Sequence, residues 1–170
     1  MADLKDSDIQ RFLRLTLTES AAATYTEFSA DTQLSIDRGM IWLINRIEYQ
    51  ISIANLDDAA QNTAESIQCH IARESQSTVL SLSDPDCIDR IRMTDDRYAT
   101  IGTEAGPLNR WAIDPFTHTF NPPLPYAATT IYGGIISTCG SAATAIVRIG
   151  YTLIKVSDKF FYRVAQALIS

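Results

Sequence analysis

The sequence predicts an all-β protein, an antiparallel sandwich of eight or nine strands. Two stretches, 40–53 and 142–156, alternate apolar and polar residues over lengths well beyond the about five to six residues of a typical strand. Helical patterns are short and occur only between strands and at the C-terminus, so a parallel α/β sheet is not expected. No repeat, charge run or linker divides the chain, which indicates a single domain over 9–170 after a short acidic lead at 1–8.

The composition is that of a globular protein with few charges. Hydrophobic residues make up 46% of the 170 residues, charged residues make up 20%, and the net charge is −6. A chain with so little charge must bury much of its surface, within itself or against neighbours. The acidic balance disfavours long-range attraction to nucleic acid or anionic lipid. The N-terminus has no signal-peptide pattern, which predicts folding in a cytoplasm.

Four strand patterns occupy the first half of the chain. The expected strands lie at 13–18, 24–36, 40–53 and 67–71. In the longest of them, 40–53, the odd-numbered residues are mostly apolar and are expected to face the core. That parity leaves Trp42 on the opposite face, together with Arg46 and Glu48.

The middle of the chain mixes turns, short strands and helical signals. Residues 55–64 are expected to form one or two helical turns or a polar loop, and 79–82 a short strand. Pro85 follows a capping Asp84, so 85–93 is expected to be a short helix that buries Ile88 and Ile91. Further strands are expected at 98–101 and 108–113. The segment 115–125, PFTHTFNPPLP, is expected to be a rigid extended crossing at one end of the domain, because proline restrains its own φ and its predecessor.

The most apolar part of the chain follows. Stretches 129–139 and 141–156 predict two strands, and a hairpin turning near Gly140 is the simplest connection between them. Arg148 is the only charged side chain between Ala127 and Ile154, and we expect it to meet an acid on an adjacent strand or on a neighbouring copy. Glycine, threonine and serine interrupt this run, so it is not a membrane span. The chain ends in a predicted helix whose apolar residues recur at helical spacing. These are Phe161, Val164, Ala165 and Leu168.

No catalytic or metal-binding motif is present. Cys69 and His70 are neighbours on one predicted strand and therefore point to opposite faces, and His118 lacks a serine or aspartate at a recognisable spacing. Three cysteines without C-x-x-C spacing favour free thiols, with at most one disulfide, over a zinc site. The acids at 84, 86 and 89 lack the spacing of a calcium loop. We therefore expect no cofactor, no metal and no enzymatic activity.

Six aromatic residues and one arginine are the candidate contact residues. Large apolar groups on both faces of strands, in a chain with few charges, indicate contacts beyond a single monomer, or a second face covered by a loop or by the C-terminal helix. The predicted subunit-interface residues are Trp42, Trp111, Phe116, Phe120, Tyr126, Tyr132 and Arg148.

The strand 40–53, the proline-rich segment 115–125 and the strand 142–156 with its short C-terminal helix resemble the architecture of viral single jelly-roll capsid proteins. The small ones of tail-less icosahedral viruses are the most similar. The resemblance implies a jelly-roll sandwich that assembles with copies of itself into an icosahedral shell. It also implies other capsid proteins as partners, synthesis in the host cytoplasm and residence in the virion.

One feature departs from many RNA-virus coats, because the chain lacks an N-terminal arm rich in arginine and lysine. The resemblance therefore does not extend to genome binding by such an arm. The absence of the arm suits a capsid that encloses a membrane, or a capsid filled by other proteins. No transmembrane segment is expected. Two other classes stay open. One is a carbohydrate- or host-receptor-binding sandwich with Trp111, Tyr126 and Tyr132 stacking on sugar, and the other is a small β-sandwich enzyme that uses His70 or His118.

Overall fold

The computed structural model describes residues 9–34, 39–53, 64–96 and 115–169. Within these ranges the chain forms eight strands followed by one helix. The elements are β1 (Arg11–Thr18), β2 (Thr26–Asp31), β3 (Met40–Ile53), β4 (Ala64–Ala72), β5 (Cys87–Asp96), β6 (Phe116–Tyr126), β7 (Thr130–Ser137), β8 (Ala143–Lys155) and α1 (Asp158–Ile169).

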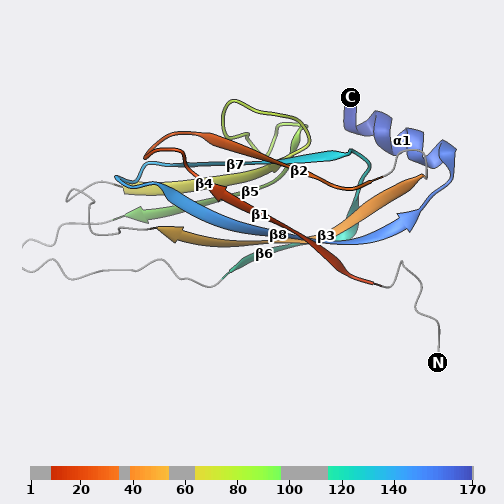
Figure 1. Cartoon of the computed structure of the whole chain (residues 1–170), viewed down its shortest axis with the longest axis horizontal. Helices are drawn as coiled ribbons and strands as arrows, with labels where there is room; N and C mark the ends of the chain where they lie inside the picture. Colours follow the sequence, from red (N-terminus) through yellow and green to blue (C-terminus); the bar gives the residue numbers. More distant parts are fainter. Residues whose placement is uncertain (1–8, 35–38, 54–63, 97–114, 170) are drawn as a thin grey trace, which may run out of the picture.

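The strands form two four-stranded antiparallel sheets. The first sheet has the order β1-β8-β3-β6 and the second the order β2-β7-β4-β5. They lie one above the other as the two layers of a sandwich (Figure 1). Eight antiparallel strands divided between two sheets in these orders make a jelly roll, so the predicted all-β jelly-roll sandwich is confirmed.

The pairing of β3 with β8 runs through the middle of the first sheet. It extends from Met40 opposite Lys155 to Ile53 opposite Ala143, and the antiparallel register shifts between Ile44 and Arg46. The extra residue there is Asn45, which forms a β-bulge. Both long strands predicted from the sequence are therefore present, side by side.

The bulge changes which side of β3 faces the core. Before it, Trp42 and Ile44 are buried between the sheets, and after it Ile47 and Tyr49 are buried there. The predicted single inward parity of 40–53 is therefore wrong for the first half of the strand. Trp42 is 1% exposed and stacks on Tyr151, with 3.9 Å between the ring centroids.

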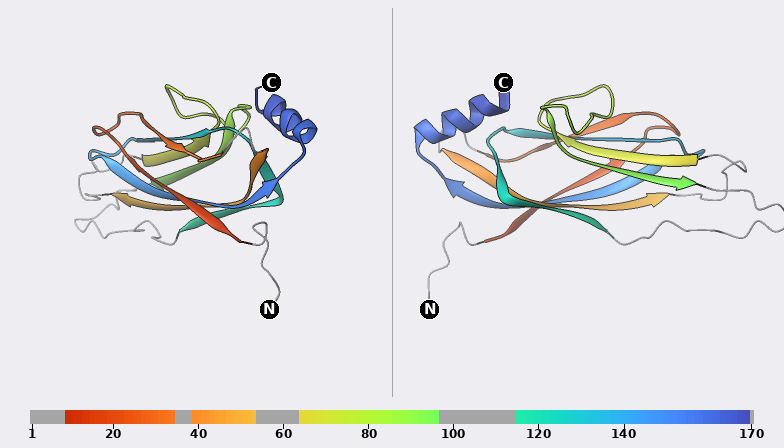
Figure 2. Two further views of the ribbon diagram at one scale, coloured as in Figure 1. Left: turned by 45° about the vertical axis from the view of Figure 1, so that its right-hand side comes forward. Right: turned by 180° about the vertical axis from the view of Figure 1, so that it is seen from behind.

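The helix α1 covers the odd-numbered side chains of β3 before the bulge. Phe161 and Val164 pack against Ile41, and Leu43 lies at the edge of the same cluster. The predicted C-terminal helix is confirmed, and it lies at one end of the sandwich (Figure 2). No helix among the described residues is long and apolar enough to cross a membrane.

The predicted helix at 85–93 and the predicted strand at 79–82 are both wrong. The carboxylate of Asp84 accepts a hydrogen bond from the N–H of Asp86 at 3.0 Å, which makes a turn and not a helix cap. The chain then enters β5, which pairs with β4 along its length. Residues 79–82 form no strand, because the N–H of Leu80 is bonded to a side chain, that of His70.

Two connections also differ from expectation. Residues 116–126 are not a crossing segment but the strand β6, which pairs with β3 alone and forms an edge of the first sheet. An edge strand tolerates prolines because half of its N–H groups need no partner. The predicted hairpin near Gly140 is absent, since β7 and β8 belong to different sheets. The elements expected at 55–64, 98–101 and 108–113, including Trp111, lie outside the described residues, apart from Ala64 at the start of β4.

Candidate functional site

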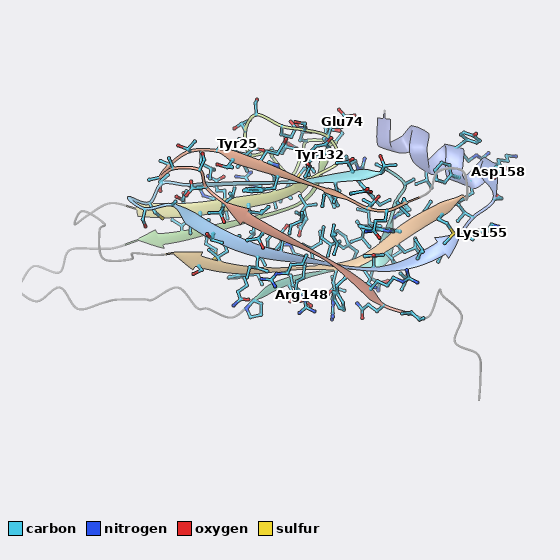
Figure 3. The ribbon with its side chains drawn as sticks, in the orientation of Figure 1. Tyr25, Glu74, Tyr132, Arg148, Lys155 and Asp158 are labelled. Carbon is cyan, nitrogen blue, oxygen red and sulfur yellow. The ribbon has the colours of Figure 1, made fainter. Side chains whose placement is uncertain are left out.

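A cluster of arginines lies on the outer surface of the first sheet, on strands β1, β8 and β3. We call this cluster the arginine face, and its residues are Phe12, Arg14, Arg46, Glu48 and Arg148. Side chains alternate along a strand, so these residues point away from the core while their neighbours Leu13, Val147 and Ile47 point into it. Arg148 projects from the underside of the sandwich in Figure 3.

Glu48 and Phe12 hold two of the arginines. The guanidinium of Arg148 lies 3.2 Å from one carboxylate oxygen of Glu48, and that of Arg46 lies 3.1 Å from the other. Both guanidinium groups also lie over the ring of Phe12, at 4.6 Å and 5.0 Å from its centroid, within the range of a cation–π contact. The expectation that Arg148 meets an acid on an adjacent strand is confirmed.

Gly150 provides the space for this cluster. It is the partner of Phe12 on β1 and of Arg46 on β3. A Cβ atom at Gly150 would lie 2.9 Å from Cγ of Arg46 and 3.0 Å from Oδ1 of Asn45. The missing side chain therefore lets Arg46 cross β8 toward Phe12.

The arginine face is electropositive on a chain of net charge −6. Glu48 is its one acid against three arginines. Arg14 and Arg148 are direct partners across β1 and β8, an arrangement in which like charges repel. Among the described residues, Arg14 has neither an ion pair nor a hydrogen bond, so its charge is open to an incoming group.

A loop of opposite character covers the outer surface of the second sheet. We call residues 73–86 the acidic loop, because its exposed or half-buried acids are Glu74, Asp84 and Asp86. The carboxylate of Glu27 accepts hydrogen bonds from Ser75 Oγ at 2.6 Å and from the N–H of Gln76. The loop is closed by a bond from the N–H of Arg73 to the carbonyl of Asp86 at 2.9 Å.

His70 fixes the middle of the acidic loop. Its Nδ1 accepts a hydrogen bond from the N–H of Leu80 at 3.2 Å, and its Nε2 lies 3.5 Å from the hydroxyl of Tyr25. Burial lowers the pKa of His70 to about 4, and burial raises the pKa of the neighbouring Cys69 thiol on the core side. With both ring nitrogens engaged and no exposed surface, His70 is a structural residue and not an accessible base.

His118 lies at one edge of the sandwich, between the edge strands β5 and β6. Its Nδ1 is 2.8 Å and 3.0 Å from the two carboxylate oxygens of Asp89, and the hydroxyl of Tyr49 donates to Asp89 at 3.0 Å. Burial and the Asp89 charge raise the pKa of Tyr49 well above its ordinary value. Among the described residues, no hydroxyl or thiol bonds to the ring of His118. The trio therefore joins the two sheets.

The acids at 84, 86 and 89 do not converge on a common point. Asp89 points inward to Tyr49, whereas Asp84 belongs to the turn before β5. Within the part of the chain that the structure describes, no three His, Cys, Asp or Glu side chains are placed to hold a metal ion. The three cysteines form no disulfide; Cys69 and Cys139 are buried and Cys87 is half-buried.

The structure separates the predicted contact residues into two groups. Trp42 and Tyr126 are 1% and 0% exposed, and the Tyr126 hydroxyl donates to the carbonyl of Thr130 at 2.6 Å, so both belong to the core of this chain. The expectation that Trp42 presents an outer contact surface is corrected accordingly. Exposed or partly exposed surface is found at Phe116, Phe120, Tyr132 and Arg148, for which a role in an interface stays a prediction. The sequence did not point to Phe12.

No protein-family model and no curated protein sequence matches the chain. Among solved structures it is similar to Trichodysplasia spinulosa-associated polyomavirus VP1, with 8% identity, 91% of this chain and 98% of that chain covered, and a TM-score of 0.46. The same protein in complex with GM1 oligosaccharide matches with 8% identity over 88% of this chain and 96% of that chain, with a TM-score of 0.46. Merkel cell polyomavirus VP1 in complex with GD1a oligosaccharide matches with 7% identity over 90% of this chain and 97% of that chain, with a TM-score of 0.46. Similarity at this level concerns the fold alone and says nothing of shared ligands.

Proposed function

We propose that this chain is a structural subunit of a viral shell, a capsid protein that assembles with copies of itself. The observation that carries the proposal is the sheet order, β1-β8-β3-β6 against β2-β7-β4-β5, which is that of the jelly rolls used by viral capsids. The same fold also serves lectins and cupins, so the choice among them depends on the side chains that the chain presents.

The described polar clusters favour a structural role over catalysis. His70 is buried with both ring nitrogens engaged, and the ring of His118 is tied to Asp89, which Tyr49 also binds. These groups connect loops and sheets to one another. Within the described residues no three His, Cys, Asp or Glu side chains are placed to hold a metal ion. The hydroxyls beside the two rings, those of Tyr25 and Tyr49, take part in the same connections.

Exposed apolar side chains are distributed over several sides of the molecule, as assembly into a shell requires. Among the described residues the large exposed ones are Ile9, Phe12, Leu82, Phe116, Phe160 and Tyr162. They belong to the approach to β1, to β1 itself, to the acidic loop, to β6 and to α1. Several modest contacts of this kind, repeated by symmetry, stabilise a shell through multivalency.

The proposal places the protein in the virion, after synthesis in the host cytoplasm, with other capsid proteins as further partners. The first ten residues, MADLKDSDIQ, carry three aspartates and one lysine. Contact with the genome through a basic arm in this stretch is therefore not part of the proposal. An enclosed membrane or other internal proteins would fill such a shell.

Sedimentation velocity and negative-stain electron microscopy of the purified protein test the proposal. At micromolar concentration, over a range of salt, we expect species much larger than the 18.8 kDa chain, with closed particles or ring-shaped intermediates in the images. A protein that stays monomeric under every salt and pH condition would contradict the proposal.

A sugar-binding module is the main alternative that the sequence leaves open. Its expected stacking platform includes Tyr126, which is fully buried in the structure, and Tyr132, which is half-buried. The alternative therefore loses one of its three aromatic residues. A glycan array with the monomeric protein separates the two functions, because a shell subunit of the kind proposed does not require binding to any glycan.

A further inference from the structure

We infer that the acidic loop of one copy docks on the arginine face of the next copy, with Leu82 against Phe12 and the carboxylate of Glu74 on Arg14. This contact is one of those that build the proposed shell, so the inference rests on the proposed function. Neither the two surfaces nor the two residue pairs follow from the fold alone.

The two surfaces belong to opposite sides of one molecule. Glu74 lies above the second sheet, and Arg148 lies below the first (Figure 3). The whole thickness of the sandwich separates these two residues (Figure 3), so the loop cannot reach the arginine face of its own chain. The contact must join different copies. Because it joins two different surfaces, it is heterologous, and repetition gives a closed ring or shell or an open chain.

The charges of the two surfaces are complementary. Arg14 has no partner among the described residues, and Arg148 shares the single carboxylate of Glu48 with Arg46. On the loop, Glu74 is exposed and likewise has no partner within the described ranges. A carboxylate placed between β1 and β8 relieves the repulsion between Arg14 and its cross-strand partner Arg148.

The apolar groups are complementary as well. Leu82 is 68% exposed, although hydrogen bonds to His70 and Glu27 fix the loop on which it lies. Phe12 is 39% exposed between two guanidinium groups. Burial of both side chains in one contact removes apolar surface from water, and a loop already held in place loses little conformational entropy when it docks.

Charge reversal in the full-length protein tests the contact. Arg14→Glu has no partner to lose within the described structure, so the fold should survive, which circular dichroism and thermal unfolding check. We expect it to weaken association by about tenfold or more, since like charges across an interface are strongly unfavourable. Glu74→Arg should do the same, and the double variant with both changes should regain the wild-type association. High salt should weaken the wild type.

Two matched controls accompany these variants. Arg163→Glu on α1 makes the same change of net charge at an exposed residue that belongs to neither surface. It should leave association within about twofold of the wild type, far less than a direct like-charge contact would change it. For the apolar pair the control is additivity. Leu82→Ser should weaken association, and adding Phe12→Ala should weaken it little further, because both exposed side chains belong to one contact.

The outcomes separate the inference from the proposed function. A wild type that never assembles would overturn the proposed function, and the inference with it. A wild type that assembles, with Arg14→Glu assembling equally well, would overturn the inference alone. The inference would also be overturned if the double variant remained as weak as the single ones. It would be overturned too if Arg14→Glu lost binding to a single-stranded oligonucleotide while its assembly was unchanged.

Discussion

The Nδ1 atom of His70 accepts a hydrogen bond from the N–H of Leu80 at 3.2 Å and so fixes the acidic loop to the second sheet. The ring is fully buried. Burial lowers its pKa to about 4, with Arg90 adding to the effect and Glu27 and Asp84 opposing it. A proton on Nδ1 would face the N–H of Leu80 and break this bond, so the loop is attached by a neutral histidine.

The first prediction is a loss of stability in mild acid. The unfolded chain binds this proton near pH 6.5 and the folded chain only near pH 4, so the unfolded state holds more protons between these values. The contribution of neutral His70 to the free energy of unfolding is complete above pH 6.5. It is lost as the pH falls to about 4, and it changes no further below that value. We expect a loss of about 1–3 kcal/mol in the free energy of unfolding, measured by urea unfolding at several pH values.

A variant that cannot titrate is the control for this effect. His70→Asn keeps an acceptor near the position of Nδ1, so the hydrogen bond from the N–H of Leu80 can persist. Because asparagine does not titrate, the free energy of unfolding of this variant should fall less between pH 6.5 and pH 4 than that of the wild type. His118→Gln removes the other histidine and should retain the contribution of His70. Equal pH dependence in the wild type and in His70→Asn would show that another group is responsible.

The second prediction concerns Glu19, a buried carboxylate at the end of β1. It accepts three hydrogen bonds of 2.7 Å, from the N–H and hydroxyl of Ser137 and from the N–H of Ala143. These bonds connect β7 of one sheet to β1 and β8 of the other. Glu19→Gln should reduce the free energy of unfolding by about 2–4 kcal/mol, because its amide group presents donors to buried donors. Urea unfolding at neutral pH measures the loss.

The half-exposed ion pairs of Glu48 provide the comparison. Glu48→Gln removes a charge from the arginine face and should cost only about 0–1 kcal/mol, since ion pairs near the surface contribute little. If the two substitutions destabilised the protein equally, the buried bonds of Glu19 would not be the connection between the sheets that the structure indicates.

The third prediction concerns the bridge between β5 and β6. Asp89→Ala leaves the hydroxyl of the fully buried Tyr49 without its partner, which should cost about 2–3 kcal/mol of stability. His118→Ala should cost less than about 1 kcal/mol, because the side chain of His118 is 45% exposed and water can replace it. Chemical denaturation of both variants and of Tyr49→Phe tests this order. A larger loss for His118→Ala than for Asp89→Ala would contradict it.

The sequence predicted the sandwich because the alternation in β1, β3, β4 and β8 is long and regular. It could not predict the change of parity in β3. An extra residue such as Asn45 leaves no mark on the pattern, since Trp42 and Ile44 are apolar but so are Ile41 and Leu43. Both faces of this half-strand are covered, one by the core and one by α1, and periodicity cannot tell two buried faces apart.

The errors in the middle of the chain have a different cause. Asp84 and Pro85 are good signals for a helix start, yet the same residues suit a turn before a strand. The pairing of β5 with β4 decided between them, a tertiary effect that overrides local preference. The connection of β7 to β8 is similar, because a turn near Gly140 does not specify whether the next strand joins the same sheet.

The candidate site was predictable in part. Arg148 stood out as the lone charge of an apolar run, and its partner Glu48 lay on the predicted outer face of β3. Phe12 could not be connected to them, because the register that brings β1, β8 and β3 together appears only in the folded sheet. The acidic loop was hidden for the same reason, since its position depends on His70 and on Glu27 of another strand.

The last prediction compares two glycines with different surroundings. A Cβ at Gly134 would lie 2.5 Å from the hydroxyl oxygen of Tyr25 and 2.8 Å from Cε1 of His70, both parts of rigid rings. Gly134→Ala should therefore cost about 1–3 kcal/mol of stability by overpacking. A Cβ at Gly150 meets Cγ of Arg46 and the amide ends of Asn45 and Gln10, none of which is part of a rigid ring.

Gly150→Ala should change the free energy of unfolding by less than about 1 kcal/mol. Alanine lowers the conformational entropy of the unfolded chain relative to glycine, which offsets the cost of moving the neighbouring side chains. The readout that separates the two is proteolysis of the acidic loop at neutral pH. Gly134→Ala displaces the ring that bonds Leu80, so cleavage within 73–86 should accelerate in this variant alone. Equal cleavage in both variants would show that the loop does not depend on the position of His70.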